Sequence, residues 1–389
     1  MPRARFHRAS PPEGNLLAVD LLRTLAIFAV VASHARAAFP FPEWEPLQKI
    51  WNTVSTTGAN GVYVFFVVSG FLITRLIDRG PGGLEKPGLR WFYARRAGRI
   101  LPLWAFAVLF GAFMFTFVDD PKMRYSFCYR NPAASYGPAF WLSLPTLTFN
   151  WYTLLPFHGD IGRHWSVMWS LAVEEQFYLL YPWMLRSLGG GRPLVRLLSA
   201  VVLLGPLTRA AAAWAFPNVE FLPLLSSFTG FELIAAGALA YLAFRDRGWK
   251  APLPVRLASV LGGAALLAFL FTREMSLPHF GTRLFGPTGI ALATTVLLGG
   301  LLSLEKPLRA AGAAVLAVPG RLSYGLYLLH ITCLYFLHPF LRPLSWGVSV
   351  PVYMAATLAV AWVSHRLFEK PANLAIRRAF GHGDVRASG

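Results

Sequence analysis

The sequence predicts an all-α integral membrane protein, built as a bundle of about ten transmembrane helices. Of its 389 residues, 55% are hydrophobic and only 14% are charged, whereas a soluble domain carries about a quarter charged residues. Apolar runs of about 20 residues, long enough to cross the hydrocarbon core of a bilayer, recur along the chain. Lysine and arginine gather in alternate loops between these runs, which is typical of a multi-pass membrane protein.

The apolar runs begin near residue 16. The first run follows Arg3, Arg5 and Arg8, but it is too long for the hydrophobic region of a signal peptide and has no small-residue cleavage site. We therefore interpret it as a retained span. The ten predicted helices lie near residues 16–38, 60–78, 100–118, 168–187, 195–215, 226–244, 255–271, 286–304, 321–341 and 349–368.

The lysines and arginines set the orientation of these helices. If residue 1 is cytoplasmic, most of the 36 basic residues fall in inner segments, as the positive-inside rule requires. Both termini are then cytoplasmic, with tails at 1–14 and 372–389 around one transmembrane domain at 15–371. The same rule explains the net charge of +18 without a nucleic-acid partner. The localisation that we expect is the bacterial inner membrane.

Residues 139–157 are apolar and almost long enough to span the membrane. A span there would turn the basic loops after residue 187 outward, against the positive-inside rule. We therefore predict that 119–166 is a large outer loop between the third and fourth helices. Its aromatic side chains could stack on a sugar or form an interfacial belt. They are Tyr125, Tyr129, Tyr136, Trp141, Trp151, Tyr152 and Trp165.

The first helix carries two ionisable residues in its apolar run, Arg23 and His34. They are 11 positions apart, which is only about 20° from three full turns, so both lie on one helix face, roughly 16 Å apart along the axis. Ionisable residues within a span are costly and usually face a partner or a cavity. The alternatives are an ion pair between Arg23 and Asp20, and a hydrogen-bonded structural role for His34.

A second polar group lies in the fourth helix, in the motif WSLAVEEQFYLLYP at 169–182. Glu174 and Glu175 point about 100° apart, so at most one of them faces a shared cavity. A carboxylate at this depth needs a partner, and Arg23 or His34 could supply it. The alternative is a buried polar clamp between helices.

Three arginines enter the third helix in the motif FYARRAGRILPLW at 92–104. Arg95, Arg96 and Arg99 together suit bidentate contacts with phosphate, and a helix N-terminus favours an anion. Contacts with the phosphates of lipids are the alternative. In the second helix, Ser69 is followed by a glycine, a pair that allows close approach of another helix or leaves room for a ligand.

Five motifs occur in a characteristic order: the Arg-x10-His of the first helix, FFVVSGFLI, FYARRAGRILPLW, WSLAVEEQFYLLYP and GRLSYGLYLLH at 320–330. Together they resemble the acyltransferase-3 family of integral-membrane enzymes, such as the O-acetyltransferases of lipopolysaccharide, exopolysaccharide and other glycosylated acceptors. The resemblance runs from about residue 15 to 371 and ends with LFEKP. One position departs from it, because Val167 stands where relatives often have a histidine, and His164 lies further upstream.

The resemblance implies roles for these residues. The implied catalytic residues are His34, Arg23 and Glu174. The resemblance also implies that Arg96 and Arg99 bind the donor, an acyl-CoA such as acetyl-CoA used without a metal. From the residues themselves we add Arg95, beside these two, for the phosphates and Ser69 for the pantetheine arm. Weaker candidates for the acceptor site are Glu175, Tyr178, Trp165 and Trp151. His34 could remove the proton of an attacking hydroxyl, oriented by Glu174, or it could form an acyl-histidine. We favour direct transfer.

We therefore expect a membrane O-acyltransferase that moves an acyl group, most simply acetyl, from cytoplasmic acyl-CoA to a hydroxyl of a glycan or glycosylated acceptor at the outer face. The alternative is a transporter whose intramembrane Arg, His and Glu form a proton or anion site. The two halves of the chain, however, show no repeated helix pattern. A different superfamily of membrane acyltransferases would use a histidine in a late helix, such as His330, which we interpret here as structural.

Overall fold

The computed structural model describes residues 16–36, 38–39, 41–117, 137–154, 163–219, 222–245, 251–273 and 280–380, and within these ranges it contains helices and no strands. The all-α prediction is therefore confirmed. The long helices are α1 Leu17–Ala35, α3 Gly61–Asp78, α4 Leu89–Phe117, α10 Met168–Leu188, α11 Arg192–Ala215, α13 Ser227–Phe244, α14 Leu253–Phe271, α15 Phe280–Ser303, α18 Ser323–Leu341 and α19 Trp346–Ser364. Shorter helices are α2 Glu45–Thr57, η1 Gly58–Asn60, α7 Pro138–Ser143, α8 Phe149–Tyr152, α9 Arg163–Ser166, α12 Leu222–Leu225, α16 Glu305–Ala310, α17 Val318–Arg321, the π-helix η2 His365–Glu369 and α20 Lys370–Phe380.

Nine helical segments of the described residues are long and apolar enough to cross a membrane. They account for every predicted span except 168–187. That segment forms α10, which at 21 residues has the length of a span, but Glu174, Glu175 and Gln176 interrupt its apolar run. In the fold α10 contacts α3, α11 and α13, so its polar side chains are placed inside the bundle.

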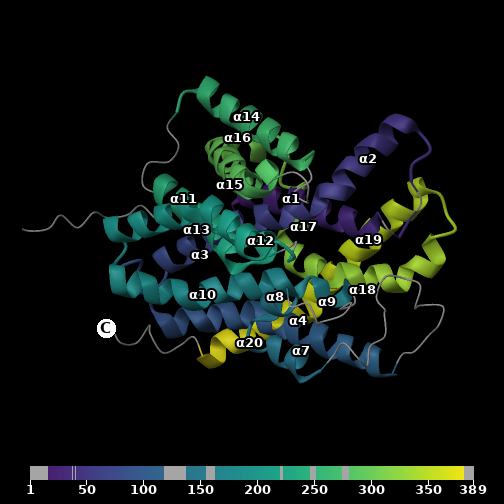
Figure 1. Ribbon diagram of the computed structural model, residues 1–389, viewed down its shortest axis with the longest axis horizontal. Helices are drawn as coiled ribbons and strands as arrows, with labels where there is room; N and C mark the ends of the chain where they lie inside the picture. Colours follow the sequence, from purple (N-terminus) through teal and green to yellow (C-terminus); the bar gives the residue numbers. More distant parts are fainter. Residues whose placement is uncertain are drawn as a thin grey trace, which may run out of the picture.

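Helix α1 lies at the centre of the bundle, in contact with α3, α15, α17 and α18 (Figure 1). Helices α3 and α13 pack closely, because each presents a glycine to the other. A Cβ atom at Gly70 would overlap the carbonyl oxygen of Ile234, and one at Gly237 would overlap that of Val67. Small residues let membrane helices approach to backbone distance, and Gly70 is used in this way.

The described part of the segment between α4 and α10 contains no membrane-spanning helix. Of residues 139–157, those that the structure describes, 139–154, form the short helices α7 and α8 with turns between and after them, in agreement with the loop predicted there. Three of its tyrosines, Tyr125, Tyr129 and Tyr136, lie outside the described residues, as do the expected N-terminal tail and residues 381–389.

The C-terminal segment is more ordered than the tail that we expected from residue 372. A π-helical turn, η2, leads from α19 into α20, and α20 packs along α4 (Figure 1). The two helices approach closely at Gly98, where an added Cβ would lie 3.2 Å from the carbonyl oxygen of Asn373. Helix α20 has the sequence KPANLAIRRAF, in which polar residues four positions apart share one face. That face carries Asn373 and Arg377 towards the cavity described below.

Candidate active site

A cavity of about 530 Å³ opens between α1, α3, α4, α10, α18 and α20. Among the described residues, the charged side chains that line it are seven arginines and two carboxylates, namely Arg23, Arg75, Arg79, Arg95, Arg96, Arg99, Arg377, Asp20 and Glu174. Aromatic and small polar side chains complete the wall, including Phe65, Trp91, Tyr178, Tyr324, Tyr327, Ser69 and Ser170. Because arginine stays protonated in proteins, the cavity has a large positive excess, and such a field attracts a polyanion.

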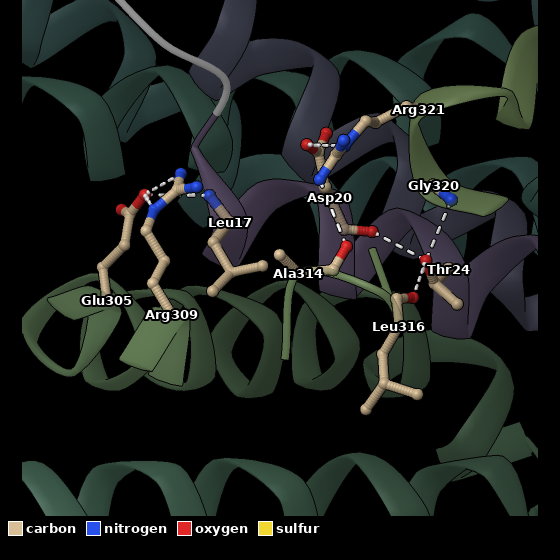
Figure 2. A network of polar contacts seen from close by, with 9 residues as sticks. All are labelled: Leu17, Asp20, Thr24, Glu305, Arg309, Ala314, Leu316, Gly320 and Arg321. Carbon is tan, nitrogen blue, oxygen red and sulfur yellow. Dashed lines mark hydrogen bonds and ion pairs between the residues drawn. The ribbon is translucent and has the colours of Figure 1, made fainter. Parts of the chain in front are cut away.

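The first turns of α1 are fixed by contacts with the 305–321 segment (Figure 2). The N–H group of Leu17 donates to Glu305 at 3.0 Å. The hydroxyl of Thr24 lies 2.9 Å from both the carbonyl oxygen of Leu316 and the N–H group of Gly320. These contacts hold the part of α1 that carries Arg23 at a constant position in the cavity wall.

Arg23 forms no ion pair with Asp20, the partner that their spacing suggested, although the charge of Asp20 acts on it. The buried carboxylate of Asp20 instead lies 3.4 Å from Nε of Arg321 (Figure 2). Within the described part of the chain, the structure gives Arg23 no hydrogen bond or ion pair. Its guanidinium lines the cavity, close enough to Arg99 and Glu174 for their charges to act on it.

Glu174 is the carboxylate of α10 that faces the cavity. Its Oε1 accepts a hydrogen bond of 2.6 Å from the hydroxyl of Ser69, and its Oε2 accepts one of 3.4 Å from Tyr178. The charges of Arg23, Arg96 and Arg99 also act on this carboxylate. The structure therefore brings together Arg23, Ser69, Glu174 and Tyr178, which the sequence had singled out in three separate helices.

Glu175 points elsewhere, as the rotation between adjacent helix positions requires. Its Oε1 lies 3.7 Å from the guanidinium of Arg96, and that guanidinium lies 4.0 Å above the centre of the Tyr178 ring. Arg96 is thus partly occupied by protein groups. The guanidinium of Arg95 lies 4.3 Å from the centre of the Trp91 ring. The positive charge of Arg377 on α20 also acts on Arg95.

Arg99 differs from its two neighbours on α4. It borders the cavity and remains exposed, and no hydrogen bond or ion pair joins it to the residues that the structure describes. Arg96 and Arg23, two like charges, lie near it. An exposed guanidinium beside like charges is suited to receive an anionic group from a ligand.

His34 lies beyond the cavity, in the last turn of α1, and is not part of the cavity wall. Its imidazole meets that of His330 on α18, with ring centroids 4.9 Å apart. The cavity reaches towards this pair as far as Tyr327 and Ser170, whose hydroxyls lie 2.7 Å apart. His34 is therefore outside this cavity in the structure, although it is on the same face of α1 as Arg23. Within the described ranges, no group of three His, Cys, Asp or Glu side chains could hold a metal ion.

Comparison with known proteins agrees with this arrangement. The model of the acyltransferase-3 family, described as an acyltransferase domain, matches residues 16–366. The chain belongs to the acyltransferase-3 family. No solved structure matches it.

Several relatives of this acyltransferase-3 chain carry names that state an activity. It is 26% identical to a putative peptidoglycan O-acetyltransferase, YrhL of Bacillus subtilis, over 95% of this chain and 56% of the relative. It is 27% identical to the peptidoglycan O-acetyltransferase OatA of Listeria monocytogenes, over 91% of this chain and 55% of the relative. Over 166 residues, 42% of this chain and 24% of the relative, it is 30% identical to the O-acetyltransferase OatA of Staphylococcus aureus. The chain thus spans little more than half the length of the first two relatives.

The two tryptophans proposed for the acceptor site lie away from the cavity of this acyltransferase-3 domain. Trp165 is fully buried, with the rings of Phe140 and His164 at 5.2 Å. Trp151 packs against Phe228 of α13. Both positions fit a packing role better than contact with a sugar.

Some residues of the acyltransferase-3 cavity were not found by sequence reasoning. Arg75 and Arg79 end α3 one turn apart, and Arg377 belongs to α20. We counted all three as ordinary basic residues of the inner loops. The i, i+4 spacing of Arg75 and Arg79 was a signal that they share a helix face. For Arg377 the signal was the amphipathic pattern of α20.

Proposed function

We propose that this chain transfers an acetyl group from acetyl-CoA to a hydroxyl of a cell-envelope glycan, and that this glycan is peptidoglycan. The observation that carries the proposal is the cavity in which seven arginines face two carboxylates. Coenzyme A is a polyanion with a pyrophosphate and a ribose phosphate, so its charge complements such a wall. The names of the relatives support acetyl as the acyl group and favour peptidoglycan over lipopolysaccharide.

The donor would lie along the axis that joins the cavity to the histidine pair. Its phosphates would contact the arginines near the ends of α3, α4 and α20, and its narrow pantetheine arm would extend past Ser69 and Glu174. The thioester would then approach His34, which lies roughly 16 Å from Arg23 along α1. For this, the wall of the cavity near Ser170 and Tyr327, whose hydroxyls are hydrogen-bonded, would have to open, because His34 is outside the cavity.

His34 would act as the general base. As the acceptor oxygen bonds to the thioester carbonyl carbon, the hydroxyl proton passes to the imidazole. The carbon–sulfur bond then breaks, and the leaving thiolate takes that proton to give free coenzyme A and an acetyl ester. A positioned base typically contributes about 10²–10⁴-fold to such a step. Glu174 contributes from the cavity side, where it fixes Ser69 and offsets the charge of the arginines.

The two substrates would enter from opposite sides of the membrane. The basic residues of the predicted inner loops support a cytoplasmic position for the arginine cavity, on the side where acetyl-CoA is made. His34 would then lie in the outer half of the bilayer, within reach of an acceptor outside the cell. The proposed localisation is accordingly the bacterial inner membrane.

The test is an assay of coenzyme A release by the protein purified in detergent. With acetyl-CoA and soluble peptidoglycan fragments, we expect thiol release that depends on the fragments, together with acetyl esters on the glycan detected by mass spectrometry. The His34→Gln variant should lose both signals. A transporter would bind a substrate without releasing thiol, so the absence of acceptor-dependent release from wild-type protein would contradict the proposal.

A further inference from the structure

The buried histidine of α18 has a defined hydrogen-bonding state. His330 is 0% exposed, and its Nδ1 lies 2.8 Å from the carbonyl oxygen of Tyr327 and 3.2 Å from that of Leu326. A carbonyl oxygen only accepts hydrogen bonds, so the proton of the neutral ring lies on Nδ1. The lone pair of the ring is therefore on Nε2. This atom lies 3.3 Å from Nδ1 of His34.

Two contacts of Nδ1 determine the tautomer of His34. This atom lies 3.0 Å from the carbonyl oxygen of Val30, and it also faces the lone pair on Nε2 of His330. Both of these groups accept hydrogen bonds, so Nδ1 of His34 carries the proton, and its N–H group donates to the two acceptors together. The basic nitrogen of His34 is then Nε2. A second proton on His330 would lie on its Nε2 and oppose the Nδ1–H of His34, which is why the geometry fits a neutral His330.

We propose that His330 is a positioning residue for His34. It fixes the Nδ1–H tautomer, so that Nε2 of His34 is the atom that takes the hydroxyl proton. It also accepts the Nδ1–H hydrogen bond when His34 becomes positively charged. The hydrogen bond made by one ring nitrogen sets the state of the other, and an acidic residue does the same for the histidine of a catalytic triad. The role in proton transfer rests on the function proposed above.

The surroundings hold His330 in place for this role. Its backbone carbonyl accepts a hydrogen bond of 3.1 Å from the hydroxyl of Tyr353, a fully buried residue of α19. Its ring lies 6.0 Å from that of Tyr327. Tyr327 belongs to the cavity wall, so His330 lies next to a residue of that wall as well as next to His34.

The first test reads the tautomer without reference to activity. In ¹⁵N-histidine-labelled protein, the ¹⁵N chemical shifts of His34, assigned by comparison with His34→Gln, should show Nδ1 protonated. In His330→Phe, which keeps the ring shape but not the acceptor, the proton should move partly to Nε2. In His330→Gln, whose side-chain carbonyl can accept and whose amide can donate, it should stay on Nδ1. His338→Phe, on the same helix, is the matched control and should change nothing.

The second test reads acetyl transfer. We expect His330→Phe to lower kcat by about 10²-fold, the lower end of what a positioned base contributes, with the KM for acetyl-CoA unchanged, and His330→Gln to recover most of the rate. A packing role predicts the reverse order, because phenylalanine suits an apolar site better than glutamine. The proposal is overturned if the His34 tautomer is the same in all variants. It is also overturned if His330→Gln loses the Nδ1–H form, an outcome that can be measured even if His330→Phe does not fold. If the tautomer shifts as expected but wild-type protein transfers no acetyl group, the positioning contact stands and the proposed function fails.

Discussion

Replacing Arg99 and Arg96 with glutamine, one at a time, separates donor binding from folding. The two arginines are neighbours on α4 and both line the cavity. Arg99 is exposed, and no described residue pairs with it, whereas Arg96 lies against Glu175 and Tyr178. We expect the first variant to lose affinity for coenzyme A at constant stability, and the second to lose stability as well.

The magnitudes follow from these contacts. A hydrogen bond to a charged group contributes about 1.5–3 kcal/mol, and each 1.4 kcal/mol is about a factor of ten. Arg99→Gln should therefore weaken coenzyme A binding about 10- to 150-fold. Without donor, the same change removes a charge close to Arg23 and Arg96, so the melting temperature should not fall.

Arg96→Gln has a different cost because it removes contacts within the protein. The side chain of Glu175 is 19% exposed and would lose its cationic neighbour, and a desolvated cation–π contact of the kind made with Tyr178 is itself worth about 2 kcal/mol. We expect a clear fall in melting temperature. The assay is calorimetric titration with coenzyme A in detergent, alongside thermal unfolding. Unchanged affinity in Arg99→Gln, or equal destabilisation of the two variants, would refute this reasoning.

Three further predictions concern other charged positions. Glu174→Gln keeps one acceptor oxygen, enough for the shorter hydrogen bond from Ser69, and its amide nitrogen can donate to the Tyr178 oxygen instead. Because the change removes a negative charge from the cavity, kcat for acetyl transfer should fall while the KM for acetyl-CoA does not rise; a raised KM would assign Glu174 to donor binding. Arg377→Gln should raise that KM with little change in kcat or melting temperature, because Arg377 is half-buried on α20 and lines the mouth of the cavity; an unchanged KM would remove α20 from the donor site. The buried carboxylate of Glu232 is the ion-pair partner of Arg209. Glu232→Leu should lower the melting temperature, because it leaves the charge of Arg209 buried without this partner, a cost of about 3–5 kcal/mol. Adding Arg209→Leu should recover much of the loss.

The transmembrane helices and much of the cavity could be predicted because both depend on local sequence. A long run of apolar residues indicates a membrane span, and an ionisable residue within a span indicates a cavity or a partner side chain. On these grounds Arg23 and Glu174 were found, whereas Arg99 was found from the arginine cluster at a helix start and Ser69 from the small-residue pair in its helix. The structure brings the four together in one cavity wall. The sidedness of the cavity stays a prediction, because no membrane is part of the structure.

The residues that were missed depend on contacts between distant segments. Helix α20 is short and polar, so hydropathy could not identify it, and only its packing on α4 brings Arg377 to the cavity. The contact between His34 and His330 joins positions 296 residues apart. The helical periodicity of a sequence does not predict a contact between side chains so far apart in the chain. Without knowledge of that contact, His330 was interpreted as structural.

A comparison of two arginines shows why pairing, rather than presence in an apolar segment, identifies the site. Arg209 on α11 is fully buried, but its guanidinium donates to Glu232, to the hydroxyl of Thr288 at 2.6 Å and to the carbonyl oxygen of Leu284 at 2.7 Å. The partners offset the cost of removing the charge from water, so this arginine is explained by the fold alone. No described residue makes a hydrogen bond or ion pair with Arg99; it lies beside the like charges of Arg96 and Arg23, and the carboxylate of Glu174 acts on it at longer range. An anionic ligand that paired with Arg99 would reduce the repulsion between these arginines. The unpaired arginines therefore point to the donor site, and the paired one does not.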